Sequence, residues 1–325
     1  MTPINNLIAR ISYNVGSNLP VVMLMHGWSE DAHTFSDAMY TRLANYGLFV
    51  CGVGMRGRNS ADGARDASAR EIYDIYDALA YVRTNYPTIV SSTIAAIVGY
   101  SGGGGNTLAA CCKFPDAWNV AVDHFGMADY GRNNPNAWYY TNTDYDATII
   151  TSVGDTPANV PDKYYARDAT VGITNYSGGY LYMYHSPTDD KVSVVNSQRI
   201  KAALDAVPLT NYAYSESTAY THGTPDTNPT LATLEPTWIA KIKSQAAWTI
   251  PASGTITVIG YIITKRFTIW LNTGLDAAAT VVYDTVAGTY TVTPLTSNAV
   301  VAVTITQGAL TASGNTNGAT LFTVA

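Results

Sequence analysis

Residues 97–105 read Ile97-Val98-Gly99-Tyr100-Ser101-Gly102-Gly103-Gly104-Gly105, and the fold of the chain follows from them. An apolar, largely β-branched run ends in Gly-x-Ser-x-Gly, and helix-forming residues follow from Thr107. This pattern predicts a strand that turns sharply into a helix, with Ser101 at the apex. The turn forces the serine into a strained backbone conformation, and the glycines beside it let neighbouring chain pass without a Cβ clash.

The glycine-rich turn has two other possible interpretations. A flexible loop has the same composition, and glycine-rich loops between a strand and a helix also bind phosphates. The second interpretation is weaker here, because the lysine of a P-loop is missing and no G-x-G-x-x-G spacing follows the strand. The rest of the chain favours a nucleophilic serine.

Buried-type strands alternate with helical patterns on both sides of this turn. Such alternation predicts an α/β fold, a mostly parallel sheet with helices on both faces and ligands at the carboxyl ends of its strands. We expect an edge strand at 7–13, further strands at 21–25, 48–53, 94–98, 120–124, 180–184 and 212–214, and helices at 67–86, 105–113, 194–206 and 236–247.

Two regions depart from this alternation. Residues 130–176 are rich in Asn, Tyr, Asp and Pro and show little periodicity, which is typical of a lid or binding loop. Residues 251–325 hold only short β-branched runs separated by turn residues, which predicts an all-β sandwich. Its strands are expected at 255–264, 267–271, 280–283, 289–293, 299–306 and 320–324. We therefore predict a catalytic domain over 1–248 and an accessory module over 251–325.

The accessory module has two possible roles. It can attach the protein to an oligomer, a larger assembly or a polymeric substrate. Alternatively, it can be a stabilising cap in which Tyr261, Ile263 and Trp270 pack against the first domain. Both interpretations predict that the module does not build the catalytic site, because it contains no His or Cys.

Composition excludes several classes of partner. Charged residues make up 13% of the 325 residues, against roughly 25% in ordinary domains, and the net charge is −6. No basic cluster is present, so we expect no nucleic acid and no anionic membrane as partner. Cys51, Cys111 and Cys112 lie in core-type segments and predict buried thiols without a disulfide. No cofactor or metal site is expected.

The sequence shows no signal peptide and no apolar run near the ~20 residues of a membrane span. We expect a protein that is soluble as made. It is either cytoplasmic or, given the low-charge surface, extracellular as part of a particle.

A serine nucleophile needs a base, an acid that orients the base, and donors for the oxyanion. Downstream of Ser101, Asp189 and Asp190 follow a strand end, and His222 lies in a later loop, so nucleophile, acid and base come in the order of an α/β hydrolase. The backbone N–H groups of Gly102 and Trp28 are the expected oxyanion donors. The competing bases, His26, His33, His124 and His185, all precede Asp189 and violate this order.

Several segments resemble the catalytic domain of the α/β-hydrolase superfamily, closest to its prolyl-oligopeptidase-like and acyl-peptidase-like branch. The resemblance covers residues 1–247 and implies that the first aspartate of the acidic loop, Asp189, is the catalytic carboxylate, with Asp190 as the second choice. The segments are His26-Gly27-Trp28, Met55-Arg56-Gly57-Arg58, Asp74-Ile75-Tyr76-Asp77-Ala78, Gly99-Tyr100-Ser101-Gly102-Gly103, Phe114-Pro115-Asp116 and His185-Ser186-Pro187-Thr188-Asp189-Asp190-Lys191-Val192.

The departures from that branch shape the functional hypothesis. Its peptidases carry a β-propeller before the hydrolase domain, which is not seen before the first strand here, and Ser186 replaces the usual glycine of the acidic loop. We therefore expect a serine carboxylesterase or acetylesterase that acts on a small ester or an acylated polymer. The alternatives are a serine peptidase of the prolyl-oligopeptidase type and a non-catalytic binding protein on a hydrolase scaffold.

Overall fold

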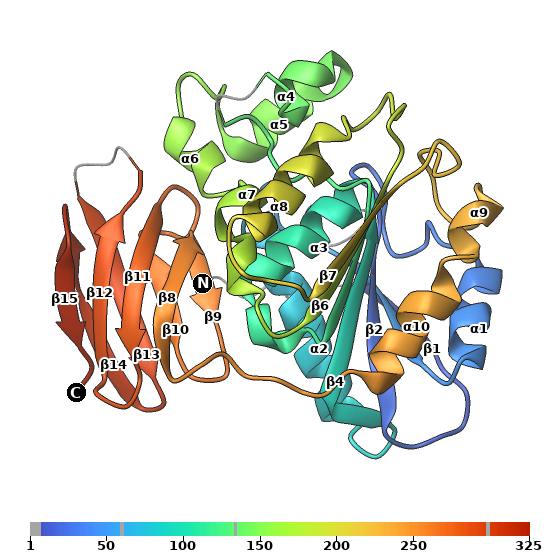
Figure 1. The fold of residues 1–325 in the computed structure, drawn as a ribbon, viewed down its shortest axis with the longest axis horizontal. Coiled ribbons are helices and arrows are strands. Elements are labelled where there is room, and N and C mark those ends of the chain that lie inside the picture. Colours follow the sequence, from blue (N-terminus) through green and yellow to red (C-terminus); the bar gives the residue numbers. More distant parts are fainter. Residues whose placement is uncertain (1–7, 59–61, 133–134, 297–299) are drawn as a thin grey trace.

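A seven-stranded sheet forms the centre of the larger part of the molecule (Figure 1). The computed structural model describes residues 8–58, 62–132, 135–296 and 300–325. The strand order is β1-β3-β2-β4-β5-β6-β7; β1 is antiparallel to β3, and the other pairs are parallel. This confirms the predicted α/β fold. The strands are β1 (Ile8–Ser12), β2 (Leu19–Met25), β3 (Phe49–Gly54), β4 (Val90–Tyr100), β5 (Val120–His124), β6 (Tyr180–His185) and β7 (Tyr212–Glu216).

Helices cover both faces of this sheet. On β2, for example, Met23 faces one core and Leu24 the other, because successive side chains alternate between the faces. The first core is covered by α2 (Glu71–Asn85), α3 (Gly102–Lys113), α7 (Ala169–Gly172) and α8 (Val195–Asp205), and the second by α1 (Asp37–Asn45), α9 (Pro229–Ala232) and α10 (Glu235–Ser244). Neither α1 nor α9 was predicted from the sequence. With four residues, α9 is too short for an apolar period, whereas α1 is amphipathic, with Met39, Tyr40 and Leu43 buried, and was missed.

The polar tract folds into several short helices above the carboxyl ends of the strands (Figure 1). These are α4 (Trp138–Thr141), η2 (Thr143–Tyr145), α5 (Asp146–Val153) and α6 (Pro161–Tyr165). At the end of the tract, α7 and η3 (Ile173–Asn175) instead pack in the first core, on the face of the sheet. None exceeds eight residues, which explains the missing periodicity. Tyr130, Trp138 and Tyr164 of this insertion pack with Trp28, which follows β2, in a small aromatic core.

The C-terminal residues form an antiparallel sheet with the order β14-β13-β10-β9-β8-β11-β12-β15. It folds into two layers around its own core, as a sandwich (Figure 1). Two details differ from the prediction: the run at 255–264 is divided by Gly260, whose φ is 76°, and β14 was not predicted. The strands are β8 (Ser253–Ile259), β9 (Tyr261–Ile263), β10 (Thr268–Leu271), β11 (Ala278–Asp284), β12 (Thr289–Pro294), β13 (Val301–Gln307), β14 (Leu310–Thr316) and β15 (Thr320–Thr323). Residues 7 and 299, at the ends of two predicted strands, lie outside the described residues.

The two sheets are joined by buried contacts. Tyr261 belongs to the same apolar cluster as the core under α2 and α3, and its hydroxyl donates to the carbonyl of Ala69 at 3.0 Å. The buried Lys113 donates to the carbonyl of Ile259, and burial lowers the pKa of its ammonium to about 7. This packing agrees with the stabilising-cap interpretation, whereas the domain division itself stays a prediction.

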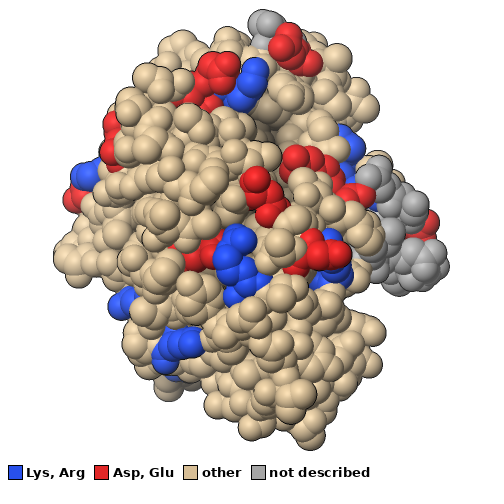
Figure 2. Space-filling model, turned by 90° about the vertical axis from the view of Figure 1, so that its right-hand side faces the viewer, with Lys and Arg blue, Asp and Glu red and all other residues tan. Residues whose placement is uncertain are grey.

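The surface carries few charges. Figure 2 shows acidic and basic side chains in small groups, several of them in contact, with wide uncharged areas between the groups. Within the described ranges, no helix has the length and apolar character that crossing a membrane requires.

Candidate active site

The turn after β4 has the geometry that its glycines imply. Ser101 has φ 56° and ψ −120°, a strained conformation for a residue with a Cβ, and its N–H donates to the carbonyl of His124 at 3.0 Å. A Cβ on Gly99 would lie 1.9 Å from the carbonyl oxygen of Gly103, and one on Gly103 would lie 2.1 Å from that of Met25. Only glycine fits at these positions, so Ser101 is held at the end of the strand.

Loops after three strands bring Ser101, His222 and Asp189 together. Nε2 of His222 lies 2.9 Å from Oγ of Ser101, and its Nδ1 lies 2.8 Å from Oδ2 of Asp189. The ring of Phe125 lies beside the imidazole, with centroids 4.7 Å apart. The three residues therefore form a continuous hydrogen-bonded chain from hydroxyl to carboxylate.

The Asp189 carboxylate is held on both of its oxygens. Oδ1 accepts from the N–H groups of Lys191 and Val192 at 2.8 and 2.9 Å, while Oδ2 faces His222. Burial opposes ionisation, but the hydrogen bond and charge of His222 and the two N–H donors hold the pKa of Asp189 below its usual value. The carboxylate is thus ionised where a neutral imidazole needs to be oriented.

The second-choice carboxylate lies elsewhere. The side chain of Asp190 is 79% exposed, and its Oδ2 lies 3.6 Å from Nζ of the also exposed Lys191. Unlike Asp189, it points to solvent at the rim.

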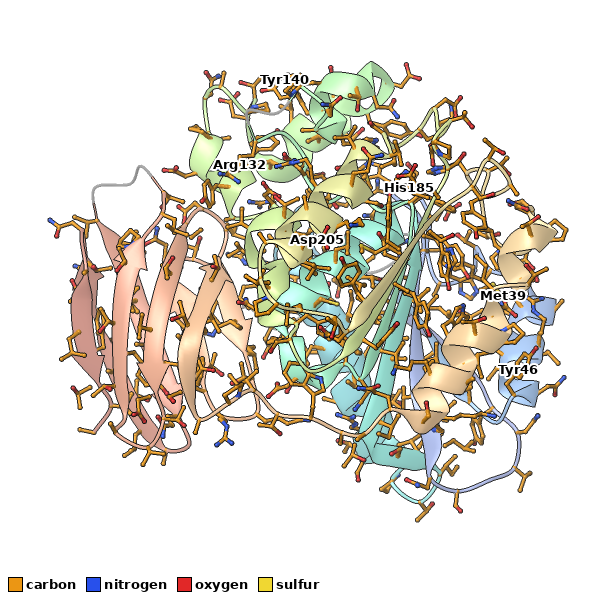
Figure 3. All side chains as sticks on the ribbon, viewed as in Figure 1. Met39, Tyr46, Arg132, Tyr140, His185 and Asp205 are labelled. Carbon is orange, nitrogen blue, oxygen red and sulfur yellow. The ribbon has the colours of Figure 1, made fainter. Side chains whose placement is uncertain are left out.

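The competing histidines have other partners or positions. His185, at the end of β6 (Figure 3), is buried; its Nδ1 contacts Oγ of Ser197 at 2.7 Å and its Nε2 the carbonyl of Val192 at 2.9 Å. Its Nε2 also lies 3.7 Å from Asp189, and burial lowers its pKa. His26 and His124 are buried and neutral, because burial lowers their pKa values to about 4 and about 3. His33 is exposed.

The two expected oxyanion donors are neighbours. A Cβ on Gly102 would lie 2.5 Å from the backbone nitrogen of Trp28, so the loop after β2 passes directly against the start of α3. This loop is fixed from within: the ring of His26 hydrogen-bonds the carbonyl of Gly27 at 2.9 Å, and the N–H of Gly27 donates to Oε2 of Glu30 at 2.7 Å. The backbone of Trp28 and that of Gly102 therefore lie close together next to Ser101, and their role as oxyanion donors stays a prediction.

A cavity of about 260 Å³ opens onto Ser101 and His222. The insertion supplies part of its wall and also holds the acidic loop: Nε1 of Trp138 and Nδ2 of Asn142 both donate to the carbonyl of Lys191, at 3.0 and 2.8 Å. The lining residues are Gly27, Trp28, Ser29, Glu30, Tyr100, Ser101, Trp138, Asn142, Tyr145, Lys191, Val192, His222, Gly223 and Thr224.

Sequence reasoning missed Glu30, Trp138, Asn142 and Tyr145. Glu30 had a signal, because it follows His26-Gly27-Trp28 within the span of one turn. The three insertion residues had none, since their segment lacks periodicity. In the described part of the chain, no group of three His, Cys, Asp or Glu side chains is arranged to hold a metal ion.

Comparison with known proteins identifies the family. The profile described as the prolyl oligopeptidase family matches residues 42–242, more than half of the chain. The chain belongs to the prolyl oligopeptidase family. As a member of this serine-hydrolase family it has the α/β-hydrolase fold, in agreement with the predicted resemblance. None of the curated proteins matches the sequence.

Solved structures of low identity share the fold. The acylaminoacyl peptidase of Pyrococcus horikoshii is 16% identical with a TM-score of 0.60, over 72% of this chain and 39% of that one. A puromycin-hydrolyzing peptidase of Mycobacterium tuberculosis is 19% identical with a TM-score of 0.59, over 73% and 37%. A Pyrococcus furiosus esterase is 14% identical with a TM-score of 0.51, over 70% and 84%. The matched region therefore spans only about two fifths of the two peptidases.

Proposed function

We propose that this protein is a serine carboxylic-ester hydrolase, a carboxylesterase or acetylesterase, that acts through an acyl-enzyme on Ser101. The observation that carries the proposal is the hydrogen-bonded chain from Ser101 Oγ through His222 to Asp189, with distances of 2.9 and 2.8 Å. A nucleophile, a base and an acid within hydrogen-bond reach, beside two backbone N–H groups, are the parts that acyl transfer needs.

Acylation would begin when His222 Nε2 accepts the proton of the Ser101 hydroxyl and Oγ attacks the ester carbonyl carbon. The carbonyl oxygen becomes an oxyanion that accepts hydrogen bonds from the N–H groups of Trp28 and Gly102. Asp189 stabilises the imidazolium and keeps Nδ1 protonated. The tetrahedral intermediate collapses, and His222 gives its proton to the departing alkoxide oxygen, which releases the alcohol.

Deacylation would repeat these steps with water. His222 accepts a proton from water while the water oxygen attacks the acyl carbon. The second oxyanion accepts hydrogen bonds from the same two N–H groups. Collapse breaks the bond to Oγ, which takes the proton back from His222, and the carboxylic acid leaves. No step requires a cofactor.

Esters are favoured over amides for a chemical reason. An alkoxide or phenoxide leaves with little assistance, whereas an amine leaves only when its nitrogen is protonated as the C–N bond breaks. The alternative, a serine peptidase, is favoured by the family to which the chain belongs. Comparing kcat/KM for a small nitrophenyl ester and an aminoacyl anilide separates the two, and a dominant anilidase activity would reverse the ranking.

Labelling tests whether the site is active at all. A fluorophosphonate probe should modify the native protein at Ser101 and fail to modify Ser101→Ala. Absence of labelling in the folded native protein would instead favour a binding protein on a hydrolase scaffold. For the C-terminal module, attachment to a polymer or larger assembly remains our proposal, to be tested by binding of the full chain to acylated polysaccharide.

A further inference from the structure

A carboxylate in the wall of the catalytic cavity, that of Glu30, has no ion-pair partner among the residues that the structure describes. Glu30 lines the cavity together with Ser101 and His222, and it is half-buried. None of the ion pairs among the described residues includes Glu30, although Oε2 accepts from the N–H of Gly27. A cationic ligand group that enters the cavity would be attracted to this carboxylate.

The remaining wall of the cavity suits the same kind of ligand. Trp28, Trp138 and Tyr145 line it with aromatic rings, with centroids 5.0 Å apart for both the Trp28–Trp138 and the Trp138–Tyr145 pair. The guanidinium of Arg58 already lies over the Trp28 ring, 5.5 Å from its centroid, which leaves Trp138 and Tyr145 for a ligand cation. Aromatic rings attract ammonium groups as well as apolar ones. The basic residue among the lining side chains, Lys191, is exposed and lies 3.6 Å from Asp190, so its charge is already partnered.

The position of Glu30 relates it to the reacting carbonyl. Its Oε2 binds the N–H of Gly27, the residue directly before Trp28, whose own N–H we assign to the oxyanion. Because the N–H that this carboxylate binds is one residue from the oxyanion donor, the carbonyl end of a bound acyl group would be nearer to Glu30 than its far end. The substituent best placed to meet it is therefore one on the α-carbon.

We propose that Glu30 determines specificity by binding the α-ammonium group of the acyl part, so that the preferred substrates are esters of α-amino acids. This inference rests on the proposed function, because it places the ammonium relative to the carbonyl that Ser101 attacks. An acyl group without an amine on its α-carbon, or with an acetylated amine there, offers Glu30 no cation. An acyl group that carries a negative charge is repelled.

A matched pair of substrates tests the proposal in the full-length protein. The 2-naphthyl esters of L-alanine and of isobutyric acid have nearly the same shape and differ in an ammonium against a methyl group. At pH 6.5 the native protein should turn over the alanyl ester with at least ~10-fold higher kcat/KM. The preference should shrink as pH rises above ~8, because the ammonium then loses its proton.

Glu30→Gln isolates the charge, since its amide oxygen can still accept from the N–H of Gly27. The variant should lose the alanyl preference, so that the ratio of its kcat/KM values for the alanyl and isobutyryl esters falls to about one, whatever change in rate the two esters share. Asp31→Asn is the control: it removes the adjacent carboxylate, which is outside the set of described residues lining the cavity, and should keep the preference.

The outcomes separate this inference from the proposed function. A native protein that hydrolyses both esters without preferring the alanyl one overturns the role of Glu30 alone. So does a Glu30→Gln variant that slows both esters equally, because Glu30 then acts only through Gly27. Failure to hydrolyse either ester, together with failure of the fluorophosphonate to label Ser101, overturns the proposed function itself.

Discussion

The two sheets of this protein place their side chains in different ways. In the parallel sheet the carboxyl ends of the strands meet at one edge, so Trp28 after β2, Ser101 after β4, Asp189 after β6 and His222 after β7 gather there from distant parts of the chain. In the antiparallel sheet each strand reverses its neighbour, and strand ends divide between two edges. The parallel sheet thus brings reactive residues together at one edge, whereas the antiparallel sheet distributes its strand ends over two edges.

Burial follows the same division. Strand β3 is buried at every residue, because helices cover both faces of its sheet, whereas β13 alternates between buried and exposed positions up to Ile305. We therefore expect changes at the edge of the first sheet to alter catalysis without altering stability. Changes where the second sheet meets the first should do the reverse.

The largest effect on turnover should come from substitutions of the catalytic residues at the carboxyl edge of the parallel sheet. We predict that Ser101→Ala and His222→Ala each lower ester turnover by at least ~10³-fold, with a smaller loss for Asp189→Asn, because the three groups act as a unit. Thermal midpoints should change little. Steady-state kinetics on a nitrophenyl ester provide the measurement and Asp190→Asn the matched control, since that carboxylate is exposed; an equal loss in the control would mean that the acid is wrongly chosen.

The opposite result is expected at Tyr261. Tyr261→Ala removes a fully buried ring, its hydrogen bond to Ala69 and its contact with Lys113, and should lower the free energy of unfolding by about 3–5 kcal/mol. Calorimetry should show a midpoint roughly 10 °C lower, with kcat at 20 °C within ~3-fold of native. Val282→Ala, at a residue of β11 that is 54% exposed, should shift neither quantity. A catalytic loss without destabilisation would show that the second sheet shapes the site.

Sequence patterns predicted what local sterics dictate. The elbow was predictable because no residue but glycine fits at Gly99 and Gly103, and the buried strands because both of their faces are covered. The proximity of Ser101, Asp189 and His222 followed from strand order, since parallel strands end at one edge. That prediction needed no knowledge of the loops.

What depends on contacts between distant segments was not predictable. The strand β14 is mostly exposed and polar, and it forms because β13 offers it a partner. Trp138 begins α4, a helix of four residues, and Asn142 directly follows that helix; its position is set by packing rather than by periodicity. The residues of the cavity wall could therefore not be predicted from the sequence.

Substitutions in the cavity wall should have a moderate effect on catalysis, because this wall holds the loop that carries Asp189. Asn142→Ala and Trp138→Phe each remove one donor to the carbonyl of Lys191, whose N–H holds Asp189, so we expect kcat to fall by ~5–10-fold, the equivalent of one hydrogen bond. Tyr140→Phe, on the exposed side of α4 (Figure 3), is the control. If only KM changes, the two residues contact the substrate and do not position the acid.

The smallest effect concerns Asp123, which lies under the edge at the end of β5. Its Oδ1 accepts from the N–H of Gly126 at 2.8 Å, and burial raises its pKa from 3.8 to about 7. The folded protein then keeps a proton that the unfolded chain releases, so stability falls as pH rises from about 4 to 7 and stays lower above it. Asp123→Asn cannot titrate and should lack this decline. Between pH 5 and pH 8 its thermal midpoint should gain roughly 3 °C relative to native. Buried His26 and His124 lower the stability of the fold only at acid pH. Both proteins contain them, so their contribution cancels in the difference between the two midpoints. Parallel midpoint curves would mean that Asp123 is ionised in the folded state throughout.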